Sequence, residues 1–187
     1  MSDLFDREQL KQAFTALGAD LERRGVFIEL AVYGGSAIVL QFEWRRSTSD
    51  VDAVVREGYD ERTLSPSVGA VAQSLGLDPD WLNNAVGMFT PSAEDDTLFE
   101  LAGHYPAHGT PGLRVLVARP HYLLAMKLQA LRSFDRGDRD LTDARALARH
   151  LGIADELALH DLYVSVHAEE PPVEARVRFA TIVTPQS

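Results

Sequence analysis

The sequence predicts an α/β fold of the α+β kind, in which helices flank a small mixed sheet of about four strands. This prediction depends on the order of three patterns. An apolar run at 26–33 ends in a glycine pair, a second strand-like segment follows at 50–56, and from Arg119 onward the pattern becomes helical. We therefore expect an α/β core over 1–118 and a helical part over 119–187 that packs on the core.

The first expected helix runs from Leu4 to Arg24, with Ser2-Asp3 as its cap and Gly25 as its stop. Its apolar residues recur at helical spacing, which indicates one buried face. They are Leu10, Phe14, Leu17 and Leu21. The strand expected from Val26 to Tyr33 is almost continuously apolar, which is typical of a strand buried on both faces.

The later elements follow from the same periodicities and from turn residues. We expect helices at 36–42, 60–75, 120–134, 139–150 and 153–167, a weaker helix at 173–182, and strands at 50–56, 97–102 and 113–118. The segment 78–88, which carries Trp81, is expected to be a loop or a short helical turn. A turn containing Gly137 is expected at 134–138.

Composition limits the classes of function. A hydrophobic content of 45% over 187 residues is ordinary for a globular chain with a core. The net charge of −10 argues against general DNA or RNA binding through a basic surface, although it leaves room for a local basic groove. The chain has no cysteine, no apolar stretch of membrane-spanning length and no signal-peptide pattern, so we expect a cytoplasmic protein without a membrane partner.

The motif that organises the prediction joins a glycine turn to a pair of acids. Gly34, Gly35 and Ser36 stand where a strand changes to a helix, so their N–H groups and the helix dipole suit phosphate oxygens. Asp50 and Asp52 alternate on the next strand and share one of its faces. Two adjacent carboxylates repel each other unless a cation lies between them, and hard oxygen ligands suit Mg²⁺.

Each part of this motif also has a purely structural interpretation. Asp-x-Asp is common in turns, and glycine pairs with a serine N-cap end many strands. Arg46 offers a fork for phosphate, or it pairs with Glu43 on the surface. Thr48 alternates with the aspartates, so it shares their face if the strand begins early. The two motifs together favour a nucleotide-binding function.

Lys127 and a later acidic pair add to the pattern. Lys127 falls beside the apolar stripe of the helix expected at 120–134, so its ammonium either snorkels to water or enters a cleft as a phosphate contact. Asp140 and Asp143 share one helix face. Arg136 and Arg139 lie four residues before them, which on sequence alone favours a surface ladder of ion pairs.

Taken together, these residues resemble a known superfamily. Gly34-Gly35-Ser36 followed by Arg46-x-Thr48-x-Asp50-x-Asp52 resembles the first motif of the DNA polymerase beta-like nucleotidyltransferases. More narrowly, it is similar to the minimal bacterial nucleotidyltransferases of the AbiEii toxin group and related uncharacterised families. Lys127 and the segment Arg139-Asp140-x-x-Asp143 follow in the same order and at similar distances, so the resemblance covers about 26–150.

The resemblance implies an Mg²⁺-dependent transferase, with Mn²⁺ as an alternative metal, that moves a nucleotidyl group from an NTP to a hydroxyl of RNA (tRNA) or protein. It also implies a toxin–antitoxin system with an antitoxin partner. Asp50 and Asp52 would bind the metal. The nucleotide-binding set would be Gly34, Gly35, Ser36, Arg46, Thr48 and Lys127. Lys127 and Asp140 would join the two metal-binding aspartates as catalytic residues, with Asp140 preferred over Asp143.

The sequence departs from the superfamily in one respect. Many members carry a third catalytic carboxylate on a later strand, and the segment 113–118 has none. Glu100 is the nearest candidate, whereas Glu94-Asp95-Asp96 is expected to be a solvated loop. The chain is therefore a slow enzyme, an enzyme that uses the late aspartate, or a degenerate fold that only binds nucleotide or a partner protein.

Overall fold

The computed structural model describes residues 4–58, 61–91, 94–133 and 138–184. The chain forms two compact units. Unit 1 contains 1–88 and 95–118, and unit 2 contains 89–94 and 119–187. Within the described ranges, no helix combines the length and the hydropathy that crossing a membrane requires.

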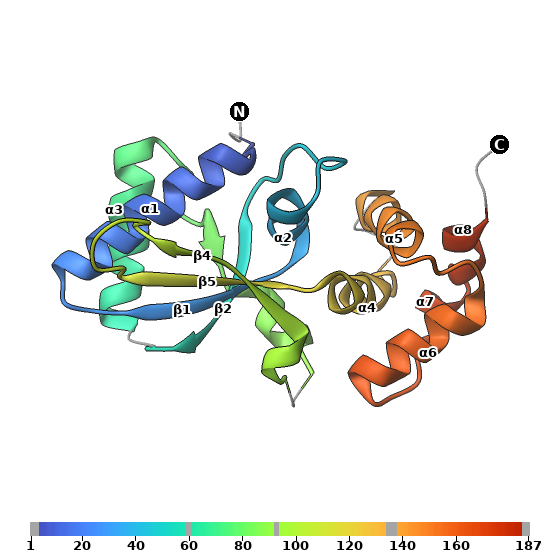
Figure 1. Ribbon diagram of the computed structural model, residues 1–187. Coiled ribbons are helices and arrows are strands. Elements are labelled where there is room, and N and C mark those ends of the chain that lie inside the picture. The colour runs from blue at the N-terminus through green and yellow to red at the C-terminus, as the bar shows by residue number, and fades with distance from the viewer. Residues whose placement is uncertain (1–3, 59–60, 92–93, 134–137, 185–187) are drawn as a thin grey trace. The chain divides into compact units, whose positions relative to one another are not determined.

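Unit 1 is built from a sheet and its helices (Figure 1). Its helices are α1 (Arg7–Arg23), α2 (Gly34–Gln41), α3 (Glu61–Leu75) and the 3₁₀ turn η2 (Asp96–Leu98), with the 3₁₀ turn η1 (Ala85–Phe89) at its boundary. Its strands are β1 (Ile28–Val32), β2 (Val51–Glu57), β3 (Leu82–Asn83), β4 (Phe99–Tyr105) and β5 (Leu113–Ala118). The expected α/β fold class is confirmed, with five strands in place of about four.

The sheet has the order β3-β2-β1-β5-β4 and is mixed. β1 is antiparallel to β2 and parallel to β5, β4 is antiparallel to β5, and β3 is parallel to β2. Every residue of the central strand β1 is buried, including Glu29, whose carboxylate pairs with Arg114 of β5. α1 packs against α3 and along β4 and β5.

The fifth strand was missed because it is short. The segment expected to be a loop contains β3, whose pairs with β2 are Leu82 with Val51 and Asn83 with Asp52. Two residues are too few to show the alternation that marks a strand. Trp81 holds this segment in place: it is fully buried, its indole N–H donates to the carbonyl of Val68 at 3.2 Å, and its own carbonyl accepts from Val51 N–H at 2.7 Å.

The ends of α1 differ from expectation at the N-terminus only. Asp6 is the N-cap, and it forms a capping box with Gln9. The expected cap, Ser2-Asp3, lies outside the described residues. At the other end Gly25 follows with φ of 70°, as a helix-stopping glycine does. β4 begins later than expected because Asp95 caps the 3₁₀ turn η2 in front of it, and the strand continues to Tyr105.

Unit 2 is helical. It contains α4 (Pro120–Ala130), α5 (Asp138–His150), α6 (Glu156–His167), α7 (Val173–Arg176) and α8 (Phe179–Val183). α4 is shorter than expected, and the turn expected to contain Gly137 lies largely outside the described residues. α6 starts at its N-cap Asp155, and the weak last helix is two short helices. α4 is the centre of the unit, packing on α5, α6 and α7.

Candidate active site

The glycine turn lies directly against one of the two aspartates. β1 ends at Val32, and α2 begins at Gly34, whose φ is 60°. A Cβ at Gly34 would lie 2.6 Å from Oδ2 of Asp52. Glycine is therefore required here twice over, since an L side chain is strained at this φ and would also displace the carboxylate.

The start of α2 is an amide-lined end. Its N-cap, Tyr33, makes no side-chain capping bond, and the first N–H groups of a helix have no partner within the helix. Ser36 is almost fully buried, and its hydroxyl donates to the carbonyl of Tyr33 at 2.9 Å. Because that hydroxyl already has a partner, the backbone N–H of Ser36 is what the residue can offer an anion.

Asp50 and Asp52 flank Val51, which is fully buried in the core. The backbone carbonyl of Asp52 accepts from Tyr33 N–H at 2.9 Å, which ties the acidic strand start to the glycine turn. The carboxylate of Asp50 accepts from Ser49 Oγ at 3.1 Å and from Asn83 Nδ2 at 3.4 Å. The strand register thus brings Asp52 to the helix start and Asp50 toward β3.

Asn83 is a site residue that sequence reasoning missed. It pairs with Asp52 across β2 and β3, and its amide donates to Asp50 while its Oδ1 accepts from Ala85 N–H at 2.9 Å. Both ends of the amide have partners, which fixes the side chain. Nothing in the local sequence marked Asn83, because its place depends on the pairing of a strand that only tertiary contacts define.

Of the two neighbouring arginines, Arg45 reaches the glycine turn. A Cβ at Gly35 would lie 2.5 Å from Nη2 of Arg45 and 2.8 Å from Oγ1 of Thr48. Arg46, the residue expected at the phosphate, is exposed, whereas Arg45 is half-buried; both line a cavity of about 530 Å³. Consecutive side chains point in different directions, so the sequence could not distinguish the two.

Thr48 holds the turn that precedes the acids. It is buried, exchanges backbone hydrogen bonds with Phe5 at 2.7 and 2.9 Å, and donates its hydroxyl to the carbonyl of Asp50 at 3.2 Å. Glu43, expected as a surface partner of Arg46, instead accepts from Arg7 at 2.8 Å. The segment between α2 and β2 is therefore held to the start of α1.

The donor set fits Mg²⁺ in its minimal form. The described residues hold no group of three or more His, Cys, Asp or Glu side chains placed for a metal. Protein Mg²⁺ sites, however, often use one or two carboxylates and take their other ligands from water and substrate phosphates. Asp50, Asp52 and the amide-lined start of α2 match that pattern, so the residues present are compatible with Mg²⁺ brought by a nucleotide.

The expectation that Glu100 is the nearest third carboxylate is wrong. Glu100 lies on β4, and the strand order places β1 and β5 between β4 and β2. At about 4.8 Å per strand, that separation is too long for a shared metal. The nearby acidic run is also more ordered than a solvated loop: Asp96 pairs with Arg56 at 3.1 Å, and hydrogen bonds from Thr97 hold the pKa of Asp95 below its ordinary value.

In unit 2, Lys127 joins both late aspartates. Its Nζ lies 2.5 Å from Oδ1 of Asp140 and 2.9 Å from Oδ2 of Asp143. The lysine and Asp143 are buried, and Asp140 is half-buried. The surface ladder favoured by the sequence is thus wrong for these acids, because their shared face turns toward α4. We call Lys127, Asp140 and Asp143 the lysine cluster.

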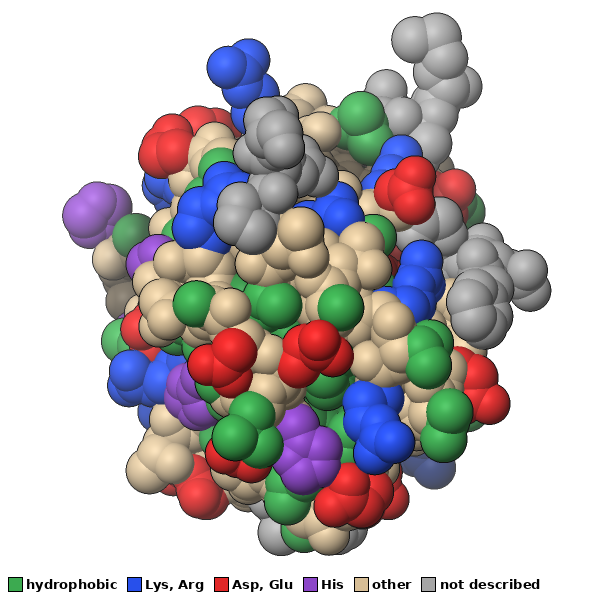
Figure 2. Space-filling model, turned by 90° about the vertical axis from the view of Figure 1, so that its right-hand side faces the viewer, with side chains coloured by type: hydrophobic (Ala, Val, Ile, Leu, Met, Phe, Trp, Pro, Cys, Tyr) green, Lys and Arg blue, Asp and Glu red, His purple; other side chains and the backbone are tan. Residues whose placement is uncertain are grey.

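On the face shown in Figure 2, the described residues form no continuous basic area. Acidic, basic and hydrophobic side chains are interspersed there. With the net charge of −10, this mixture gives no basis for general binding of a polyanion through that face.

Comparison with known proteins gives no further assignment. No protein-family model, no curated protein and no solved structure matches this chain.

Proposed function

We propose that the chain is an Mg²⁺-dependent nucleotidyltransferase that transfers a nucleotidyl group from an NTP to a hydroxyl of RNA, such as tRNA, or of a protein, and that it is the toxin of a toxin–antitoxin pair. One observation carries this proposal: the carboxylate of Asp52 lies against Gly34 at the amide-lined start of α2. A metal–nucleotide complex requires a site that binds an anion next to acids that bind a cation, and the start of α2 lies next to such acids.

The proposed roles follow from these contacts. The N–H groups of Gly34, Gly35 and Ser36 bind phosphate oxygens, and Arg45 adds a guanidinium beside Gly35. Asp50 and Asp52 hold Mg²⁺, which when bound supplies positive charge at the phosphate oxygens. Asn83 is a positioning residue, because its amide fixes the carboxylate of Asp50.

The chemical step balances without any redox partner. The acceptor oxygen bonds to the α-phosphorus, the bond from that phosphorus to the pyrophosphate oxygen breaks, and pyrophosphate leaves with the electron pair. The acceptor proton passes to a carboxylate of the pair or to water. The protein contributes positioning and electrostatic stabilisation, as is usual in phosphoryl-group transfer. Lys127 and Asp140 are given no role in this step, because they pair with each other within unit 2.

The test is transfer of label from α-³²P-labelled NTPs, with Mg²⁺, to tRNA and separately to total protein. We expect label in one acceptor, lost in Asp52→Asn and kept in Glu57→Gln, which removes a charge from the other end of β2. The proposal is contradicted if no acceptor becomes labelled while a known active transferase, run as a positive control, labels its own acceptor.

A second candidate is a degenerate fold that binds nucleotide or a partner without turnover. The residue beside Asp50 is Asn83, whose amide is neutral, and the described residues place no third carboxylate with Asp50 and Asp52. This observation favours a fold that binds nucleotide without catalysis. This candidate predicts a thermal shift with NTP and Mg²⁺ but no labelled product. Absence of any thermal shift would count against both candidates.

A further inference from the structure

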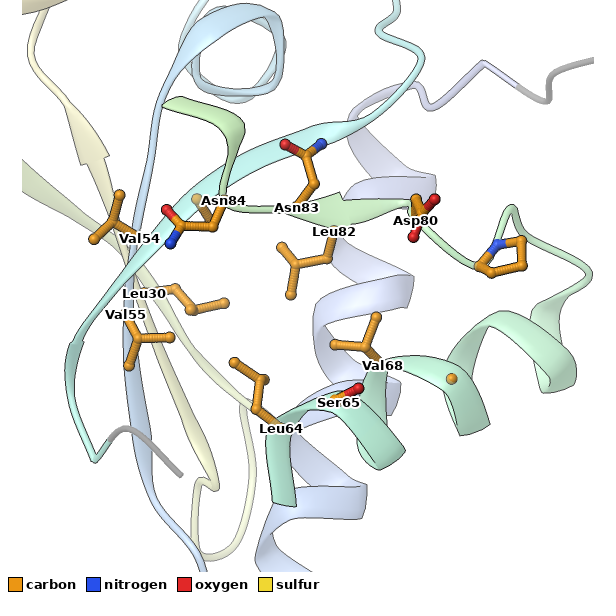
Figure 3. A pocket seen from close by; sticks show the side chains of 13 residues that line it. Leu30, Val54, Val55, Leu64, Ser65, Val68, Asp80, Leu82, Asn83 and Asn84 are labelled. Carbon is orange, nitrogen blue, oxygen red and sulfur yellow. The ribbon is translucent and has the colours of Figure 1, made fainter. Parts of the chain in front are cut away.

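A cavity in unit 1 extends along β2 from Asn83, whose amide donates to Asp50. It has a volume of about 520 Å³ and opens between α3 and the strands β2 and β3 (Figure 3). Its floor is apolar, formed by Leu30 of β1, Leu64 and Val68 of α3, and Leu82 of β3. The volume is in the range of sites that hold a small molecule or large side chains.

The cavity follows the edge of β2 and not one face of it. Ala53, Val54 and Val55 all line it, although successive side chains of a strand point to opposite faces. Three consecutive residues share one cavity only where the cavity runs along the strand's edge. Figure 3 shows the reason: β3 diverges from β2, and the cavity occupies the fork.

That edge carries backbone groups beyond the end of β3. β3 pairs with Val51 and Asp52 only, whereas β2 continues to Glu57. Val51 donates its N–H to Trp81, so the N–H and C=O of Ala53 and Val55 point to this edge. After Val55 the register with β1 shifts by one residue, and Glu57 pairs with Glu29 of β1. Among the described residues, no strand pairs with β2 there. Exposed strand edges of this kind are templates for an added strand.

The charge of the cavity restricts what could fill it. Asp80 is the one ionisable side chain among the residues that line it, and it is exposed at the rim. A cationic group is therefore favoured next to an apolar one. A second copy of this chain is disfavoured, because each copy carries a net charge of −10.

We infer that the fork between β2 and β3 binds an extended segment of a partner protein by strand addition. The segment pairs with the β2 edge from Ala53 to Val55, places an apolar side chain in the cavity, and directs a Lys or Arg toward Asp80. Backbone hydrogen bonds along an edge supply affinity in this mode, and the pocket for alternate side chains supplies specificity. The inference does not rest on the proposed transferase activity.

The probe for this surface is a capped peptide of about seven residues, long enough to pair with β2 at roughly 3.3 Å per residue, in which lysine and isoleucine alternate. Its matched control has the same side chains with N-methyl groups on alternate amides, which removes the donors that face the edge. Binding is followed by amide shifts in ¹⁵N NMR. We expect the largest shifts at Ala53 to Val55 and loss of binding with the methylated peptide.

Two substitutions on α3 complete the design. Leu64→Lys places a charge in the cavity, and Gln73→Lys places the same charge on an exposed part of α3 outside it. We expect Leu64→Lys to weaken binding by about tenfold or more, the size of an interface hot spot, and Gln73→Lys to leave it unchanged. Asp80→Lys should also weaken binding of the cationic peptide.

Several results would overturn the inference. Equal binding of the methylated peptide would mean that the cavity takes side chains or small molecules without strand addition. If the β2 amides show no shifts at peptide concentrations up to millimolar, the fork does not bind such a segment. A dimer in solution whose β2 amides are protected from hydrogen exchange would show that a second copy occupies the edge.

Discussion

The two acidic pairs of this protein have the same composition and opposite environments. Asp50 and Asp52 alternate at the start of a strand, and the carboxylate of Asp50 accepts hydrogen bonds from the neutral groups of Ser49 and Asn83. Asp140 and Asp143 lie one helical turn apart, and both bind Lys127. The first pair is half-buried and the second is closed around a cation.

This difference separates two uses of a carboxylate. A buried acid that pairs with a buried cation is needed for the stability of the fold, because removing one partner leaves the other charge buried without compensation. An acid whose partners are neutral keeps its negative charge available for an added cation. Asp50 in unit 1 is therefore a better candidate for a metal ligand than the acids of the lysine cluster, which have at least a structural role in unit 2.

The largest expected effect is on the stability of unit 2. Lys127→Ala leaves Asp140 and Asp143 without their cation, and breaking such a pair costs about 3–5 kcal/mol. Asp50→Asn should cost less, about 1 kcal/mol, because its half-buried carboxylate loses hydrogen bonds from neutral partners only. Urea denaturation of both variants measures the comparison.

The control for that prediction is Lys127→Met combined with Asp140→Asn and Asp143→Asn, which removes the charges together. It should be clearly more stable than Lys127→Ala, because no charge is left buried without a partner. If the single and triple variants lose equal stability, a buried charge without a partner is not the cause of the loss.

The next effect comes from making unit 1 more acidic. Asn83→Asp places a third carboxylate beside Asp50. Repulsion between two like charges about 4 Å apart costs roughly 1 kcal/mol in water and roughly 4 kcal/mol in a partly buried environment. We expect lower stability without divalent ions and recovery on adding Mg²⁺, because a ligand of the folded state stabilises it.

Thermal unfolding of Asn83→Asp in chelator and in Mg²⁺ measures this response, with Asn84→Asp as the matched variant one residue away. If Mg²⁺ stabilises the two variants equally, Asp50 and Asn83 are not part of a metal site.

A smaller effect on nucleotide binding distinguishes Gly34, in the glycine turn, from Gly25, which only ends a helix. Gly34→Ala and Gly25→Ala both put an L residue at positive φ, which costs about 1–2 kcal/mol. A Cβ at Gly25 meets nothing within 4 Å, whereas one at Gly34 meets the Asp52 carboxylate. We expect only Gly34→Ala to lower nucleotide binding, measured by calorimetry. Equal binding by both variants would show that the turn does not contact nucleotide.

The smallest effect is a dependence of unit 2 on pH. Burial lowers the pKa of His167 below 6.5, although its hydrogen bond to the carbonyl of Ala125 opposes the shift. Burial and then Arg119 lower the pKa of His121 in the same way. The unfolded chain therefore binds more protons, so this stability is lost as pH falls below 6.5.

The measurement is the free energy of unfolding of wild type and His167→Gln between neutral pH and pH about 5, a window in which histidine titrates. The variant should have the shallower pH slope. Equal slopes would mean that His167 does not carry the linkage.

The helices and most of the strands could be predicted because their signals are local. The apolar stripe of α1, the continuous burial of β1 and the bounds of β5 follow from residues a few positions apart. The approach of Asp52 to Gly34 could also be predicted. The glycine turn follows β1, the acids lie at the start of β2, and the end of one strand meets the start of its antiparallel neighbour.

The sequence by itself determined the α/β class, the helical second part and the meeting of the glycine turn with the acidic strand. Tertiary structure alone decided that β3 exists, that Asn83 holds Asp50, that Arg45 and not Arg46 reaches Gly35, and that Lys127 binds two aspartates. The physical reason is that periodicity fixes which face of an element is buried. Which side chain meets which partner depends on contacts between residues far apart in the chain.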